Sequence, residues 1–270
     1  MIGDERTKFI ILCAARTGST MLRYLLDSHP EIRCYGEIMA FEVTPDRWSY
    51  EAEPVSRNES VVTVSLRSAE KEARRRRKWL LDFYRGGPRQ FLEEFGLYPP
   101  EAKAIGFKIK YDELILPDHA WLLQWLRDHR EVSVIHLLRE NRLKRFISHM
   151  TATRVYGVYN ITSEEERPAT ARISLTPAEC LEDFARTEAR ERLFREYFGD
   201  HATLETTYEA VVSNRGHIRE RIGEFLNVAP AVLSTPTLKI NPENLREVVE
   251  NYDVLAAALR DTPYGGDLGS

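Results

Sequence analysis

An apolar segment near the N-terminus constrains the fold of this chain more than any other feature. Residues 8–15 are mostly apolar and lead into a loop that contains Gly18. Such a run is typical of a parallel strand that is buried on both faces of a sheet. From Ser19 onward, apolar residues recur at helical spacing until Pro30, which cannot continue a helix. The order of strand, tight loop and helix indicates an α/β fold.

The alternation of strands and helices continues along the chain. Further strands are expected at residues 31–35, 104–110, 132–138 and 204–208, the last of them at an edge of the sheet. Helices are expected at residues 121–126, 141–156, 218–226 and 242–259, and Thr176–Glu179 opens another with a capping box and a proline at its first position. These elements predict one domain over residues 1–270, with a central, mostly parallel β-sheet flanked by helices. Ligands of such sheets bind at the carboxyl ends of the strands.

Two regions lack a clear pattern. No sustained period runs through residues 41–65, and we expect the wider region 41–102 to be an insertion that caps the site and contributes to substrate recognition. A helix is expected within it at residues 68–85, where the basic run 74–78 is more typical of a solvated face than of a functional patch. The tail at residues 261–270 is expected to be loose.

Composition narrows the function classes. The 270 residues are 43% apolar, which is enough to bury one large core, although two small domains would also be possible. A net charge of -4 argues against a nucleic-acid-binding protein that works through overall positive charge. The three cysteines have no CxxC spacing, which favours a reducing cytoplasm over a disulfide framework or a zinc site. An N-terminal apolar run of about seven residues is too short for a membrane span, so a soluble cytoplasmic protein is expected.

The loop at residues 14–20 has the features of an anion site. A helix N-terminus offers backbone N–H groups and the positive end of the helix dipole. Gly18 permits close approach of the backbone, Ser19 and Thr20 add hydroxyl groups, and Arg16 adds a permanent positive charge. The GxxxxGKS/T pattern of nucleoside triphosphatases is missing because no lysine precedes Ser19, which disfavours ATP with magnesium. The alternative is an ordinary strand-to-helix turn capped by Ser19.

A second pair of residues points to another phosphate. Arg139 directly follows the expected strand at 132–138, and Ser148 lies nine residues later on the next expected helix. An arginine at a strand end and a serine on the following helix supply a guanidinium and a hydroxyl that can converge on one phosphate. The alternative is a surface arginine, which the position of Arg139 straight after a buried strand disfavours.

Taken together, these two motifs resemble the sulfotransferases that use 3′-phosphoadenosine 5′-phosphosulfate (PAPS). The resemblance implies a P-loop-like sulfotransferase fold in which the two ends of the donor are bound separately. The residues implied for the 5′-phosphosulfate are Arg16, Thr17, Gly18, Ser19 and Thr20, and those for the 3′-phosphate are Arg139 and Ser148. No proline follows Arg139, so the pattern is more similar to the bacterial trehalose 2-sulfotransferase and nodulation-factor type than to cytosolic steroid and phenol sulfotransferases.

The same resemblance implies catalytic residues. Glu37, in a Gly-Glu pair after the second expected strand, resembles the general base of the bacterial trehalose-type enzymes, which takes the proton of the acceptor hydroxyl. An exposed loop carboxylate is the alternative, with Glu42 and His149 as substitute bases. Lys108, near the end of a strand, is placed to neutralise charge on the transferring sulfuryl group, or is simply solvated there. By strand alternation, Lys110 shares its face.

Two further residues complete the implied donor site. Tyr208 stands in a Tyr-Glu pair that resembles the one found in many sulfotransferases, whose tyrosine lies near the adenine, although a core tyrosine would look identical in sequence. Lys239 begins a segment that is similar to the closing segment of related enzymes.

The reaction that follows from the resemblance is an in-line displacement. The sulfuryl group would pass from PAPS to an acceptor hydroxyl of a carbohydrate, glycolipid or small metabolite, with adenosine 3′,5′-bisphosphate (PAP) as product and no metal required. Aromatic residues of the 41–102 region would equally suit a lipid or an aromatic metabolite, namely Phe41, Trp48, Tyr50, Trp79 and Phe83. A nucleotide-dependent, kinase-like transferase and a non-catalytic nucleotide-binding protein stay open. No nucleic-acid partner or integral membrane segment is expected, and a homodimer is expected only because related enzymes are often dimeric.

Overall fold

The computed structural model describes residues 6–37, 92, 102–170 and 172–268. Most of the 41–102 region lies outside the described residues, and with it the helix expected at 68–85, the basic run 74–78, Glu42 and the aromatic residues proposed to line an acceptor site.

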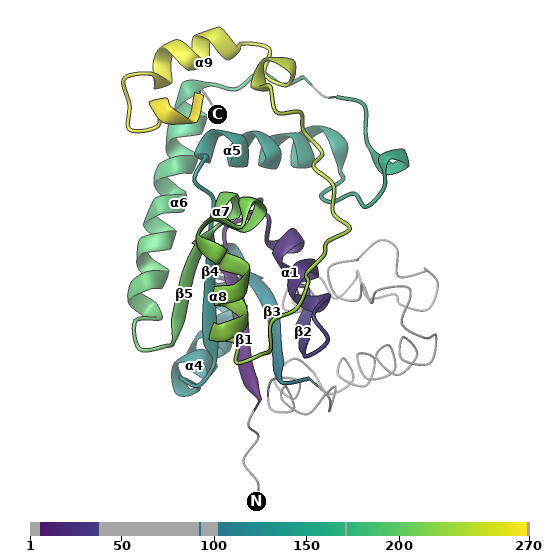
Figure 1. Cartoon of the computed structure of the whole chain (residues 1–270). Helices are drawn as coiled ribbons and strands as arrows, with labels where there is room; N and C mark the ends of the chain where they lie inside the picture. The colour runs from purple at the N-terminus through teal and green to yellow at the C-terminus, as the bar shows by residue number, and fades with distance from the viewer. Residues whose placement is uncertain (1–5, 38–91, 93–101, 171, 269–270) are drawn as a thin grey trace, which may run out of the picture.

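The central sheet contains five strands in the described part of the chain. They are β1 (Thr7–Cys13), β2 (Ile32–Tyr35), β3 (Ala104–Lys110), β4 (Ser133–Leu138) and β5 (Thr203–Thr207). Their order is β2-β3-β1-β4-β5, and every neighbouring pair is parallel. The prediction of a mostly parallel sheet is confirmed, as is the position of the 204–208 strand at an edge (Figure 1).

Helices cover both faces of the sheet. The α-helices of the described residues are α1 (Ser19–Asp27), α3 (Tyr111–Leu114), α4 (Ala120–Asp128), α5 (Arg142–Thr151), α6 (Pro177–Tyr197), α7 (Tyr208–Ser213), α8 (Ile218–Phe225) and α9 (Tyr252–Leu259). Short turns of helix are η4 (Pro117–His119), η5 (Ala152–Tyr156), η6 (Glu164–Glu166), η7 (Arg215–His217), η8 (Leu245–Glu247) and η9 (Gly265–Leu268). The prediction of an α/β fold with flanking helices is confirmed.

The side chains of β1 divide between two hydrophobic cores, as the alternation of a strand requires. Ile10 and Leu12 pack in one core with residues of α4 and α6, whereas Phe9 and Ile11 pack in the other with residues of α1 and α8. A third core joins α5, α6 and α9 beyond the carboxyl ends of the strands (Figure 1). Helix α5 is thereby held above the end of the sheet where ligands are expected.

Helices α5 and α6 each begin with a side-chain cap. The Thr176 hydroxyl accepts a hydrogen bond from the Glu179 backbone N–H at 3.2 Å, and the Glu179 carboxylate accepts one from the Thr176 N–H at 2.9 Å. This reciprocal pair is the predicted capping box of α6. At the start of α5, the Asn141 side chain accepts from the Lys144 N–H at 2.7 Å. Both helices therefore begin where local sequence dictates.

The last helix is shorter than predicted. A helix was expected over residues 242–259, but α9 begins only at Tyr252. Before it, Val249 forms a parallel bridge with Ile173, and the Asn251 side chain binds both the N–H and the oxygen of Leu175 at 3.1 and 2.7 Å. These hydrogen bonds to a distant segment replace those of a helix, so tertiary contacts override the local pattern.

The expectation of a loose tail from residue 261 is wrong as far as Leu268. Residues Gly265–Leu268 form η9, and the Asp267 carboxylate accepts from the backbone N–H groups of Arg142 at 2.8 Å and Leu143 at 3.2 Å. The first N–H groups of a helix have no partner within it. Asp267 supplies that partner to α5, and this contact orders the segment.

Candidate functional site

The site lies where the carboxyl ends of neighbouring strands meet. Cys13 at the end of β1 pairs in register with Leu137 of β4 on one side and with Lys110 of β3 on the other. The loop after β1 and the residue after β4, Arg139, therefore start from the same edge of the sheet. Parallel sheets bind ligands at this edge.

The loop between β1 and α1 has an unusual backbone. Arg16 and Gly18 have φ angles of 66° and 82°, in the left-handed region. Gly18 is the N-cap of α1, and no side chain of the described residues caps this helix. Ser19 is therefore not the cap that an ordinary turn would have, and the first N–H groups of α1 remain available to an anion.

Thr17 and Gly18 shape this loop from inside. The Thr17 hydroxyl donates to the Ala14 oxygen at 2.9 Å and is fully buried, so it stabilises the loop rather than facing a ligand. A Cβ atom on Gly18 would lie 2.3 Å from Cδ2 of Tyr208. Glycine is thus required here both by its positive φ and by the ring that packs against it.

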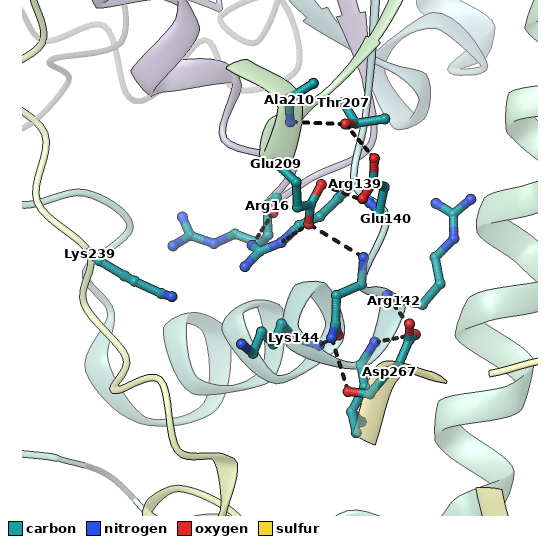
Figure 2. Close-up of polar contacts among 12 residues, drawn as sticks. Arg16, Arg139, Glu140, Arg142, Lys144, Thr207, Glu209, Ala210, Lys239 and Asp267 are labelled. Carbon is teal, nitrogen blue, oxygen red and sulfur yellow. Dashed lines mark hydrogen bonds and ion pairs between the residues drawn. The ribbon is translucent and has the colours of Figure 1, made fainter. Parts of the chain in front are cut away.

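Arg16, Arg139 and Ser148 come together although they lie far apart in the sequence. Arg139 donates from Nη1 to the Arg16 oxygen at 2.9 Å, and Arg16 donates from Nε to the Ser148 hydroxyl at 3.0 Å. Figure 2 shows the Arg16 and Arg139 side chains next to each other beside α5. The residues that the sequence assigns to the two ends of one donor therefore form a single surface.

Tyr208 and Glu209 hold Arg139 from the other side. The Arg139 guanidinium lies 4.8 Å from the centre of the Tyr208 ring, and its Nε is 3.9 Å from Glu209 Oε1. The Glu209 carboxylate also accepts from the backbone N–H groups of Glu140 at 3.0 Å and Asn141 at 3.4 Å (Figure 2). Glu209, which the sequence analysis noted only as the neighbour of Tyr208, thus fixes the turn between β4 and α5.

The charges at this junction favour an anion. Burial, and then the nearby Arg139 cation, lower the pKa of Arg16 to about 10. Burial also lowers the pKa of Arg139, whose Nε makes no hydrogen bond within the described chain. The buried Arg139 and the half-buried Arg16 guanidinium groups lie side by side, and their mutual repulsion would be relieved by a bound anion that accepts their unused hydrogen bonds.

Glu37 and Lys108 meet on the opposite side of the loop. The Lys108 ammonium lies 2.8 Å from Glu37 Oε1 and donates to the Thr20 hydroxyl at 2.7 Å, with only 3% of its side chain exposed. Burial alone would raise the pKa of Glu37, but the ammonium groups of Lys108 and Lys110 outweigh it and lower that pKa to about 2. Neither alternative, an exposed Glu37 carboxylate or a solvated Lys108, describes these residues.

Lys110 and Glu113 extend this group. The Lys110 ammonium lies 2.6 Å from Glu37 Oε2 and 3.1 Å from Glu113 Oε1. Burial opposes the charge of Lys110, but Glu113 and Glu37 together raise its pKa. Glu113 was not among the predicted site residues. The signal was its position three residues after Lys110, where a strand passes into a helix.

Lys239 forms an ion pair with Glu243. The Oε2 atom of Glu243 also lies 3.1 Å from the ammonium group of Lys144. Lys144 lies one helical turn before Ser148, on the same face of α5. Figure 2 shows Lys239 on a segment that runs beside α5. Lys144 was also not among the predicted site residues. A lysine on the surface of a helix has no sequence pattern that marks it as part of a site.

His149, a substitute base, is half-buried. Burial and then the cations of Arg145 and Arg16 lower its pKa, so the imidazole is neutral at physiological pH and able to accept a proton.

The described residues contain no cluster of three or more His, Cys, Asp or Glu side chains that could hold a metal ion. Among the described helices, none is both long and apolar enough to cross a bilayer.

Comparison with known families shows the family of this chain. A model described as the sulfotransferase family matches residues 8–231. The chain belongs to the sulfotransferase family. This match spans the loop after β1, Glu37, Lys108, Arg139, Ser148 and Tyr208, and ends before Lys239.

Solved structures of sulfotransferases resemble this sulfotransferase at low identity. One from Alicyclobacillus acidocaldarius is 17% identical, with a TM-score of 0.46 and 94% of each chain covered. The sulfotransferase domain from the curacin biosynthetic pathway is 14% identical, with a TM-score of 0.43, covering 83% of this chain and 75% of that one. A mouse sulfotransferase complexed with PAP is 14% identical, with a TM-score of 0.41, and the match covers 84% of this chain and 61% of that one. A comparison with curated protein sequences finds no significant match.

Proposed function

We propose that this sulfotransferase transfers a sulfuryl group from PAPS to an acceptor hydroxyl and releases PAP. The observation that carries the proposal is the junction of Arg16, Arg139 and Ser148. It joins the N-terminus of α1, which suits one anionic group, to a buried guanidinium and a hydroxyl that suit another. A nucleotide with phosphates at both its 3′ and 5′ positions fits two such adjoining anion sites better than one with a single phosphate chain.

The residues present suit each end of this donor. Arg139, with its buried Nε that makes no hydrogen bond in the described chain, and Ser148 would hold the 3′-phosphate. The N–H groups at the start of α1 and the Lys108 ammonium would hold the 5′ end, and Tyr208 would lie near the adenine. Once bound, the donor supplies an activated sulfuryl group and a stable bisphosphate leaving group.

Glu37 is the general base in this proposal. Burial would raise the pKa of Glu37, but Lys108 and then Lys110 outweigh burial and lower this pKa to about 2. The carboxylate is therefore ionised throughout the physiological range and able to accept a proton. The same lysines make it a weak base. Proton transfer is therefore expected late, when bonding to sulfur has made the acceptor oxygen acidic. Lys108, between Glu37 and Thr20, would neutralise charge that develops on the leaving oxygen.

The acceptor belongs to the carbohydrate, glycolipid or small-metabolite class in this proposal, by the likeness of the Gly36-Glu37 and Arg139 motifs to the trehalose 2-sulfotransferase and nodulation-factor type. Incubation of acceptor extracts with ³⁵S-labelled PAPS, followed by identification of the labelled product by mass, tests this class. A labelled product in which the sulfuryl group is attached to something other than a hydroxyl oxygen would overturn it.

Nucleotide preference tests the proposal against its alternatives. A thermal-shift titration compares PAP with ATP and magnesium, because a ligand that binds only the folded state raises Tm. Stabilisation by PAP alone supports the proposal, and stabilisation by ATP with magnesium alone supports a kinase-like transferase. Binding of PAP without turnover of PAPS on any screened acceptor would favour a non-catalytic nucleotide-binding protein.

A further inference from the structure

Glu37 is held on both sides, and the two contacts differ in kind. Its Oε1 pairs with Lys108, which also binds Thr20 in the first turn of α1. Its Oε2 pairs with Lys110, which instead binds Glu113 of α3. One lysine therefore links Glu37 to the expected donor site, and the other links it to the body of the protein.

Glu113 fixes Lys110 at two points. Its Oε2 accepts from the Lys110 backbone N–H at 2.9 Å, and its Oε1 lies 3.1 Å from the Lys110 ammonium. A carboxylate that binds both ends of the same residue restricts the rotamers of its long side chain. The Glu113 side chain is only 9% exposed, so solvent competes little for these contacts.

Helix α3, which carries Glu113, is itself tied to the core. The Tyr111 ring stacks on Phe194 of α6 with centroids 5.1 Å apart, and its hydroxyl lies 2.5 Å from His136 Nε2 of β4. His119 Nδ1 lies 2.6 Å from the Glu113 backbone oxygen. Lys110 is thus anchored through α3 to α6, β4 and η4.

We propose that Lys110, anchored by Glu113, is a positioning residue that holds the Oε2 atom of Glu37 so that the carboxylate keeps one orientation during sulfuryl transfer. This inference rests on the proposed role of Glu37 as the base. Lys110 also keeps a positive charge beside Glu37 whatever Lys108 contacts. It would hold the orientation of Glu37 without touching donor or acceptor.

The charges around Glu37 predict what removal of Lys110 does. Lys108 and Lys110 of β3 and Arg16 of the loop after β1 are cations, whereas burial raises the pKa of both the Glu113 carboxyl of α3 and the Cys13 thiol of β1. Without the Lys110 cation, Glu37 faces Glu113 with one fewer opposing charge. Its pKa should rise by about one to three pH units, the usual effect of an adjacent opposite charge.

Carboxyl NMR tests this inference directly. The Glu37 resonance in protein labelled with ¹³C-glutamate is assigned by its loss in Glu37→Gln, and its pH titration is compared in wild type, Lys110→Met and Lys110→Arg. In Lys110→Met the midpoint should move upward by about one pH unit or more, and Lys110→Arg should restore it. Lys110→Gln, which keeps a polar side chain and removes only the charge, serves if the methionine variant does not fold.

The matched control is Lys103→Met. Lys103 stands just before β3 at its other end and pairs with Glu31 at 2.5 Å, but its side chain is 60% exposed. This variant should leave the Glu37 titration unchanged. Binding of PAP, measured by calorimetry, should change less than twofold in Lys110→Met, since Lys110 contacts Glu37 and Glu113 rather than the loop.

The outcomes separate this inference from the proposed function. An unchanged Glu37 titration in both neutral Lys110 variants, or a loss of PAP affinity as large as that caused by loss of Arg139, would overturn the positioning role. Full turnover in Glu37→Gln would instead reject Glu37 as the base, whatever the titration shows. A raised midpoint, rescue by arginine and intact PAP binding support the inference.

Discussion

Arg139 donates from its guanidinium to the backbone oxygen of Arg16 at 2.9 Å. This hydrogen bond joins the residue that follows β4 to the loop that follows β1. It uses one donor of Arg139 and leaves the Nε atom buried without a hydrogen bond in the described chain. The contact thus sets the position of Arg139 while keeping part of its guanidinium for a ligand.

Replacement of Arg139 should affect one end of the nucleotide. In Arg139→Ala, affinity for PAP should fall by about 10- to 100-fold, the usual cost of a hydrogen bond to a charged group, while affinity for adenosine 5′-monophosphate changes little. Calorimetry with both nucleotides measures this difference. Arg130→Ala is the control, because Arg130 is 62% exposed and pairs only with the exposed Asp200 among described residues. Equal weakening of both nucleotides would contradict the 3′-phosphate assignment.

Replacement of Glu37 should affect turnover more than binding. Loss of a general base costs about 10²- to 10⁴-fold in rate, so kcat of Glu37→Gln should fall in this range with the acceptor found by the extract screen. PAP affinity should stay within a few fold. Glu31→Gln removes a comparable carboxylate from an ion pair with Lys103 and should keep wild-type kcat. Retention of full activity by Glu37→Gln would direct attention to His149.

Gly18 should tolerate no side chain. Gly18→Ala brings a Cβ to 2.3 Å from the Tyr208 ring at a φ of 82°, whereas Gly157→Ala has a φ of 61° and meets nothing within 4 Å. The second variant therefore measures the backbone cost alone. The free energy of unfolding, from urea titration, should fall by about 1–3 kcal/mol more in Gly18→Ala than in Gly157→Ala. Equal losses in the two variants would show that the ring does not constrain the loop.

His136 should make stability depend on pH. Burial lowers the pKa of this histidine to about 4, with Glu205 acting in the opposite direction. The unfolded chain, with an ordinary histidine pKa near 6.5, then binds the extra proton first as pH falls. His136 therefore contributes stability that is present above pH 6.5 and is lost progressively down to about pH 4. In His136→Gln, the free energy of unfolding should fall less steeply between these pH values; an unchanged slope would assign the loss to other groups.

The sheet and most helices could be predicted because their signals are local. Residues 9–13 could be predicted as a strand because they are apolar throughout, as a parallel strand buried on both faces requires. The start of α6 could be predicted because Thr176 and its capping-box partner Glu179 are only three residues apart. The candidate site was predictable for a similar reason, since Arg139 and the loop at 14–18 follow strands that end at one edge.

Contacts between distant segments were not predictable. Asp267 caps α5 by accepting a hydrogen bond from Arg142, which lies 125 positions earlier in the sequence. The segment before α9 is shaped by hydrogen bonds to Leu175 rather than by its own helical pattern. The Glu37–Lys110–Glu113 group depends on how a loop, a strand and a short helix meet. The spacing of Lys110 and Glu113 suggests their contact, but no spacing in the sequence brings Glu37 to them.

The contact between Asp267 and the start of α5 has a practical consequence. Glu209 binds the N–H groups of Glu140 and Asn141, and Asp267 binds the next two along the chain. The short turn η9 is therefore a structural part of the arginine-bearing turn that follows β4. An expression clone that stops short of Asp267, or fuses a bulky partner directly after it, would perturb nucleotide binding without altering any residue of the site.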